Sequence, residues 1–290
     1  MDATRLLPAH MLDQVRAFAT GERTPTEPRN AATIVLVRDG ASSSPGALEV
    51  YLLRRHLDMA FAGVMAVFPG GGVDPRDFDA EISWTGPSPT DWASLLGCEE
   101  SLARALVCAA VRETFEESGV LFAGESADAL VEDTSGEDWE ADRVALEARE
   151  LAFTDFLSRR GLTLRTDLLR LWGTWVTPVF EPRRYDTRFF VAAIPPGQVT
   201  RDVSTESESV TWMPVAEAIA AVDDQQMLML PPQYCTCMEL HAATSAAEAV
   251  AAADERDVRP FLPEVLLDGD RAELTTPRHF QSLYEEIHRS

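Results

Sequence analysis

The sequence predicts an α/β (α+β) protein in which helices cover a mixed β-sheet. Three observations lead to this fold class. Short strands rich in β-branched residues alternate with helical segments, some strands are close enough to pair as hairpins, and no internal repeat is visible. The chain has 290 residues, of which 46% are hydrophobic, and this is enough for one large core with an appendage.

The first elements are a short helix and three strands. Apolar residues at helical spacing predict a helix over His10–Thr20, and a Pro-rich link follows it. Apolar runs predict strands at Ala31–Val37, Leu48–Arg54 and Val64–Phe68, the last of which leads into a glycine turn, Pro69–Gly72.

A polar, Pro-rich segment at about residues 74–98 is interpreted as an inserted surface loop. The central helix then begins at Glu99–Glu100, since acids suit a first turn, and ends at Gly119, since glycine suits the position after a helix. Further elements are expected downstream: helices at Trp139–Leu151, Phe153–Arg160, Val215–Val222 and Met238–Ala253, and strands at Leu171–Phe180, Phe189–Ile194 and Val210–Met213.

These elements suggest three parts of the chain. Residues 1–28 form an N-terminal helix and linker, residues 29–222 the main domain, and residues 223–290 a C-terminal extension expected to pack on the same domain. The stretch from residue 260 onward is expected to be an irregular tail.

The charge balance excludes several function classes. Lys and Arg total 25 against 48 Asp and Glu, a formal net charge of -23. Such a chain repels nucleic acid phosphates and anionic membranes. We expect a cytoplasmic protein, because no signal peptide and no stretch of about 20 apolar residues is visible. The four cysteines suit a reducing compartment.

Three carboxylates share one face of the central helix. With each residue turning about 100°, Glu116 and Glu117 lie roughly 60° and 40° to either side of Glu113. Like charges at this spacing destabilise a helix, and a bound divalent cation would offset the cost. The alternative is a solvated acidic helix face. The glycine turn favours the metal, because the Gly71 backbone carbonyl can supply another hard oxygen ligand.

Together, the turn and the helix resemble the signature of the Nudix hydrolases, G-x5-E-x7-R-E-U-x-E-E-x-G-U, where U is apolar. Gly71 takes the first position, and the helix supplies the matches Arg112, Glu113, Glu116, Glu117, Gly119 and Val120. Asp77 replaces the first Glu, Thr114 replaces an apolar residue, and 34 residues separate Asp77 from Arg112 where the signature has seven. Because of this insertion, Asp77 is given no role.

The long insertion is similar to that of one branch of the family, which includes the mammalian peroxisomal coenzyme A diphosphatase. The segments that carry this resemblance are Leu52–His56, Val67–Gly71, Arg112–Glu117, Thr177–Pro178 and Arg183–Phe190. It implies an α/β/α sandwich that hydrolyses, with Mg²⁺ or Mn²⁺, the diphosphate bond of a nucleotide linked to another group. Coenzyme A or acyl-CoA is the first substrate expected, giving adenosine 3′,5′-bisphosphate and (acyl-)phosphopantetheine.

The resemblance also implies roles for single residues. Glu116 and Glu117 would ligate metal, Glu113 would ligate metal or accept the proton of the attacking water, and Arg112 would orient a glutamate. A further acid is expected from a later loop, either Glu206 or Glu208. The candidates for holding substrate phosphate are Arg55, Arg183, Arg184 and Arg188.

Other readings stay open. The substrate could be NADH, ADP-ribose or a dinucleoside polyphosphate, or the chain could be a regulatory module that binds a nucleotide without catalysis. The insertion at Asp74–Gly97 and the chain after Pro231 could form a homodimer interface or a substrate lid, and the sequence does not separate the two.

Overall fold

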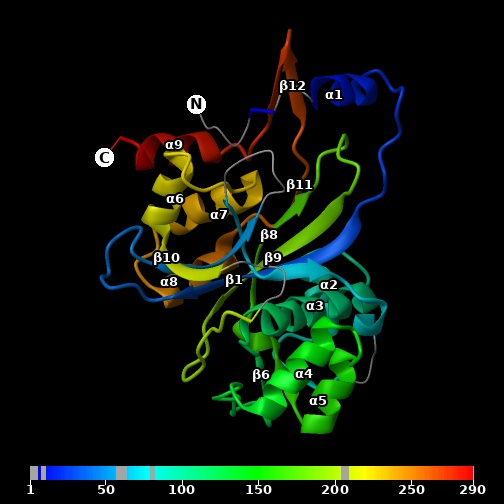
Figure 1. Ribbon diagram of the computed structural model, residues 1–290, viewed down its shortest axis with the longest axis vertical. Coiled ribbons are helices and arrows are strands. Elements are labelled where there is room, and N and C mark those ends of the chain that lie inside the picture. The colour runs from blue at the N-terminus through cyan, green and yellow to red at the C-terminus, as the bar shows by residue number, and fades with distance from the viewer. Residues whose placement is uncertain (1–5, 8–10, 57–63, 79–81, 204–208, 290) are drawn as a thin grey trace.

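The computed structural model describes residues 6–7, 11–56, 64–78, 82–203 and 209–289, except for the side chains of residues 55, 56 and 64. A mixed β-sheet lies at the centre, with helices on both faces (Figure 1). The predicted fold class is therefore confirmed. None of the helices in these ranges combines the length and apolar character that a membrane span requires.

The sheet has the strand order β10-β2-β1-β9-β8-β11, with β3 paired to β2 and β4 to β1. Its strands are β1 (Arg29–Arg38), β2 (Glu49–His56), β3 (Val64–Val67), β4 (Gly70–Gly72), β8 (Arg170–Val176), β9 (Tyr185–Ala193), β10 (Ser209–Pro214) and β11 (Pro260–Phe261). Strand β1 runs parallel to β9 and antiparallel to β4, with Ala32 opposite Gly71. The predicted glycine turn is thus a short strand beside the central strand of the sheet.

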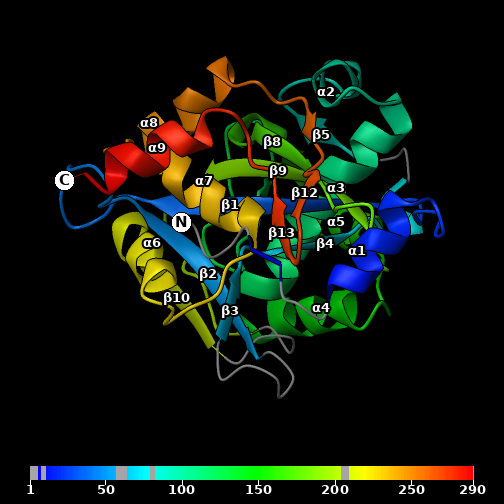
Figure 2. The same ribbon diagram turned by 90° about the horizontal axis from the view of Figure 1, so that it is seen from above.

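Alternation along the strands sorts side chains between two cores. In β1, Ile34 and Leu36 face one core, and Val35 and Val37 face the other. The helices α2 (Pro89–Leu96), α3 (Glu100–Ser118), α4 (Glu137–Glu147) and α5 (Phe153–Arg160) cover the first face. The second is covered by α6 (Val215–Asp223), α7 (Pro231–Leu240), α8 (Ala246–Ala252) and α9 (Phe280–Ile287) (Figures 1 and 2).

The insertion is more ordered than the predicted surface loop. It contains a 3₁₀ turn, η2 (Pro75–Phe78), and the helix α2, which begins at a Ser88 capping box and ends at a left-handed Gly97. It also contributes β5 to a small sheet of β5 (Trp84–Thr85), β7 (Thr163–Arg165) and β6 (Ala123–Gly124). A further 3₁₀ turn, η3 (Thr166–Leu168), follows β7.

The C-terminal part departs from two expectations. The single helix predicted over Met238–Ala253 is wrong, because α7 ends at Leu240 and α8 begins after a Ser245 cap. A 3₁₀ turn, η4 (Ala253–Glu255), follows α8, and the tail is not irregular: it carries β11, the hairpin β12–β13 (Val265–Asp268 and Arg271–Leu274) and α9. The hairpin lies beside α1 (Leu12–Ala19), with Arg16 Nη2 donating to Asp270 at 2.9 Å. The domain boundaries stay a prediction.

Candidate active site

The acidic face lies at the C-terminal end of α3. Small apolar residues fix the helix on the sheet, since Ala103 and the whole run from Ala105 to Val111 are buried. Gly119 ends the helix with φ of 75°, and its N–H donates to the Phe115 carbonyl oxygen at 2.9 Å. Thr114, which departs from the apolar residue of the signature, is also buried, and its hydroxyl donates to the Ala110 carbonyl oxygen at 2.8 Å.

Arg112 is the hub of the site. Its Nη1 donates to Glu113 at 2.7 Å and to Glu116 at 3.2 Å, as expected for a residue that orients these carboxylates. Its Nη2 donates to the Gly72 carbonyl oxygen at 3.0 Å, which ties the helix to the glycine strand. The remaining donors meet Asp77 in a two-bond fork, through Nε at 3.1 Å and Nη2 at 3.0 Å.

Asp77 therefore has a defined place, although the sequence assigned it none. It is 1% exposed, and it also accepts the Asp74 backbone N–H at 2.8 Å. The turn η2 packs directly against α3, so the short aspartate side chain reaches Arg112 in spite of the insertion.

The glycines of β4 allow the strand to approach the acids closely. A Cβ added to Gly71 would come within 2.5 Å of the Glu113 carboxylate, so a side chain there would occupy the carboxylate's position. The Gly70 N–H donates to Glu117 Oε2 at 2.8 Å. The backbone of the turn and two of the three acids are thus in direct contact.

Burial and crowding perturb the acids. Burial raises the pKa of Glu116 to about 7; the charge of Arg112 opposes this shift and the charge of Glu113 adds to it. Burial also raises the pKa of Tyr51, and the charges of Asp202 and Glu117 raise it further. Burial is thus the main reason why these two groups hold their protons more tightly than they would in water.

Comparisons with known proteins find similar sequences and a similar fold. A family model described as "NUDT19 Nudix domain" matches residues 98–240, which include the whole of α3. Over this part of its length, the chain is similar to Nudix domains. A crystal structure of a NUDIX hydrolase from Alicyclobacillus acidocaldarius has a TM-score of 0.63 and 28% identity, and the match covers 78% of this chain and 96% of that one.

Two curated Nudix relatives carry the name acyl-coenzyme A diphosphatase NUDT19. The Xenopus laevis protein is 26% identical over 219 residues, which cover 64% of this chain and 58% of the relative. The Gallus gallus protein is 26% identical over 254 residues, which cover 71% of this chain and 66% of the relative. The matches thus span less than two thirds of the length of either relative.

The later acid predicted for the Nudix site is not located. Glu206 and Glu208 lie outside the described residues. Asp202 is the acid of the same loop that lies within the described residues, and it is exposed. Its charge raises the pKa of the Tyr51 phenol, and the charge of Glu117 does the same. Sequence reasoning missed Asp202, because nothing in the local pattern distinguishes it from the other acids of this loop.

The arginines predicted to hold phosphate have different environments. The side chain of Arg55 is outside the described part of the structure, and Arg183 is exposed. Arg184 is buried and donates to the backbone carbonyls of Thr177 at 3.0 Å and Thr26 at 2.7 Å, so two of its donors stabilise the fold. Arg188 is also buried and pairs with the aspartate two residues before it. A role in substrate binding remains a prediction for all four.

The donor chemistry of the acidic face fits a hard divalent cation. Glu113, Glu116 and Glu117 offer only oxygen atoms, and the strand that touches two of them lacks side chains that could block the approach. In the conformations they adopt, no three acids, histidines or cysteines in the described ranges are gathered closely enough to form a metal-binding group. Arg112 pairs with Glu113 and Glu116. Metal binding by Glu113, Glu116 and Glu117 therefore stays a prediction.

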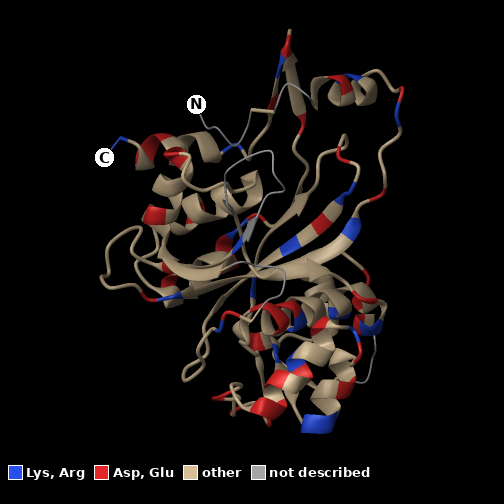
Figure 3. Cartoon of the chain, viewed as in Figure 1, with Lys and Arg blue, Asp and Glu red and all other residues tan. Residues whose placement is uncertain are grey.

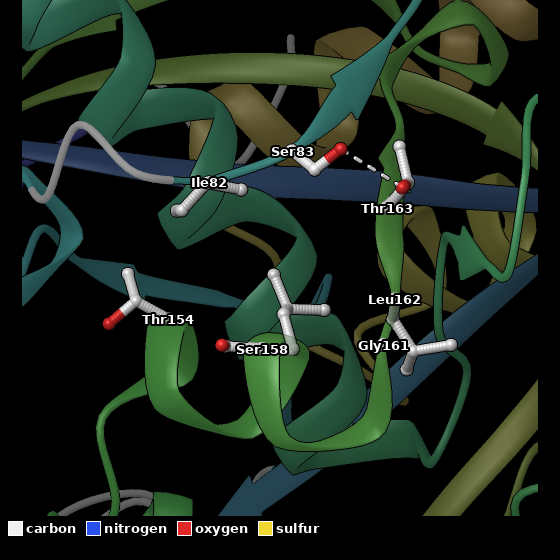
Figure 4. A pocket seen from close by; sticks show the side chains of 8 residues that line it. Ile82, Ser83, Thr154, Ser158, Gly161, Leu162 and Thr163 are labelled. Carbon is white, nitrogen blue, oxygen red and sulfur yellow. Dashed lines mark hydrogen bonds between the residues drawn. The ribbon is translucent and has the colours of Figure 1, made fainter.

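A separate pocket of about 290 Å³ lies beside α5 (Figure 4). Thr154 and Ser158 of α5 line one side, and Ser83, which shares a 3.1 Å hydrogen bond with Thr163, lines another. The lining has hydroxyls and aliphatic groups but no charged side chain, and it includes none of the box acids. It therefore offers no charge to hold a diphosphate or a metal.

Proposed function

We propose that the chain is a divalent-metal-dependent hydrolase that cleaves the diphosphate bond of a nucleoside diphosphate linked to another group. Coenzyme A or acyl-CoA is the first substrate candidate, with adenosine 3′,5′-bisphosphate and (acyl-)phosphopantetheine as products. The observation that carries the proposal is the Arg112 hub, which joins Asp77, Glu113 and Glu116 to the glycine strand. The names of the two curated relatives support the choice of substrate.

Glu113, Glu116 and Glu117 would hold the cation, together with the Gly71 backbone carbonyl. Bound Mg²⁺ or Mn²⁺ would neutralise the diphosphate charge that otherwise repels a nucleophile. Arg112 holds Glu113 and Glu116 on the helix face, and Gly70 holds Glu117 through its N–H. Glu113 serves either as a further ligand or as the acceptor of the proton of the attacking water.

The substrate is tested with the purified chain in Mg²⁺ or Mn²⁺. Coenzyme A, an acyl-CoA, NADH, ADP-ribose and a dinucleoside tetraphosphate are compared at equal concentrations, and the products are separated by chromatography. We expect the highest kcat/KM for coenzyme A or acyl-CoA. A higher kcat/KM for NADH, ADP-ribose or the dinucleotide would replace the proposed substrate but keep the reaction type.

The reaction itself is tested with Glu117→Gln, which keeps the size of the side chain and removes its charge. We expect kcat to fall by at least about a hundredfold, since the site would lose a charged metal ligand. Glu100→Gln is the matched control, because Glu100 is an exposed residue in the first turn of the same helix. Full activity of Glu117→Gln, or tight nucleotide binding by the wild type without any product, would contradict the proposed reaction.

A further inference from the structure

The last turn of α3 presents an electrostatic problem. It carries Glu116 and Glu117 at the end of the helix where unpaired carbonyl oxygens collect a partial negative charge equal to about half an elementary charge. Acids are unfavourable at this end, and the last turn has no basic residue of its own. The positively charged side chains at this end come from other segments, and each is also paired with acids there.

Arg143 of α4 supplies the first such charge. It is 3% exposed, and its Nη1 donates to the backbone carbonyl oxygen of Glu116 at 2.7 Å. The other donors of its guanidinium meet Glu140, at 3.0 Å from Nε and 2.7 Å from Nη2, and Nη1 also reaches Glu147 at 3.0 Å. Arg143 thus fixes the main chain of a box residue and leaves its carboxylate to the site.

Arg201, in the loop between β9 and β10, supplies the second charge. Its backbone N–H donates to the Ser118 carbonyl oxygen at 2.9 Å, and its guanidinium lies over Gly119, where an added Cβ would come within 2.8 Å of Nε. Its Nη1 donates to Glu140 at 2.6 Å. Glu140 therefore links the two arginines, Arg143 and Arg201, across the end of α3.

The loop that carries Arg201 is also held from the sheet. The Tyr51 hydroxyl of β2 donates to the Arg201 carbonyl oxygen at 3.1 Å, and Asp202 follows directly in the chain. The same contacts that compensate the helix end thus place this loop beside the box.

We propose that Arg143 and Arg201, joined through Glu140, are positioning residues for the Nudix box. They hold the backbone at Glu116 and Ser118, on either side of Glu117, and keep Asp202 next to the helix end. The inference rests on the proposed function, because it assigns the arginines to the cation-binding face of that site.

Packing alone does not require these contacts. The ring centroid of Phe115 in α3 lies 6.4 Å from that of Trp139 in α4 and 5.3 Å from that of Phe156 in α5. Phe115 and Phe156 are buried and Trp139 is half-buried, and these contacts dock α4 and α5 on α3 without the arginines. A variant that loses the guanidinium of Arg143 is therefore expected to fold.

The test compares Arg143→Met, Arg143→Lys and Arg165→Met. Lysine keeps the charge and can still donate one hydrogen bond to the Glu116 carbonyl. Arg165 of β7, in the small sheet, is the control. Its side chain is 11% exposed, and it forms two hydrogen bonds with Asp167. Free Mn²⁺ measured by electron paramagnetic resonance gives the Mn²⁺ dissociation constant without turnover, and steady-state kinetics with coenzyme A give kcat and KM.

We expect Arg143→Met to raise the Mn²⁺ dissociation constant about tenfold or more and to lower kcat to a similar degree, with KM within about twofold of wild type. Arg143→Lys should recover part of both losses, and Arg165→Met should match wild type in both. The inference is overturned if Arg143→Met binds Mn²⁺ like wild type, if Arg165→Met loses as much affinity, or if the wild type binds no Mn²⁺. A wild type that binds Mn²⁺ but hydrolyses nothing contradicts the proposed function, whereas the Mn²⁺ constants still decide the positioning role.

Discussion

Replacing Asp77 by alanine tests the hub of the site. The substitution removes both charged hydrogen bonds to Arg112 and the acceptor for the Asp74 N–H, all in a position that is 1% exposed. Breaking a buried ion pair costs about 3–5 kcal/mol. Because Arg112 keeps Glu113 and Glu116 as partners, we expect the lower end of that range, about 3 kcal/mol.

Urea unfolding followed by circular dichroism measures this loss. With an m-value of about 3 kcal/mol per molar urea, the midpoint should fall by about 1 M at unchanged m. Asp257→Ala is a matched control, since Asp257 also forms a two-bond fork with an arginine, Arg259, but on the surface, and its midpoint should not change. An Asp77→Ala midpoint equal to that of wild type would refute the view that the hub depends on Asp77.

Two further predictions concern Gly71 in the site and Glu239 outside it. Gly71→Ala should lower kcat at least tenfold with little change in the urea midpoint, because the new Cβ meets the flexible end of a site carboxylate; Gly72→Ala, with open space around it, should change neither. Burial acts to raise the pKa of Glu239, but hydrogen bonds from His279 and Arg256 and the positive charges of these groups leave the pKa below its usual value. The ionised Glu239 carboxylate therefore stabilises the folded wild type above the unfolded-state pKa, and this contribution is lost as pH falls. Glu239→Gln lacks the contribution at every pH. The difference in free energy of unfolding between wild type and Glu239→Gln should therefore shrink between pH 6 and pH 3.

Local patterns in the sequence were enough to locate the acidic helix. Its apolar run, its three acids and its terminal glycine lie within one stretch, and α3 ends where the glycine predicted. Two other elements also carry local sequence signals. Ser88, followed by proline and by Asp91, begins α2, and Gly269, with φ of 58°, forms the turn of the C-terminal hairpin.

The remaining features depend on contacts between distant segments. Asp77 is 35 positions from Arg112, and Arg201 is 61 positions from Glu140, so no periodicity connects either pair. In each case the pairing is decided by packing: η2 rests on α3, and Arg201 contacts the end of the same helix. A sequence motif with a long insertion therefore predicts which residues belong to the helix but not which ones complete its hydrogen bonds.

Charge compensation at the site depends on geometry more than on the number of cations. The 25 basic residues are all arginines, and the chain keeps a net charge of -23, with acidic and basic segments interspersed along α3 to α5 (Figure 3). At the box, one guanidinium faces four carboxylates, Asp77, Glu113, Glu116 and Glu117; Arg112 donates to the first three, and Glu117 accepts from a backbone N–H. A planar fork can complete hydrogen bonds in several directions, but it supplies only one positive charge. Under the proposed function, the remaining negative charge of this face would favour a bound divalent cation, and the cation would in turn attract an anionic diphosphate.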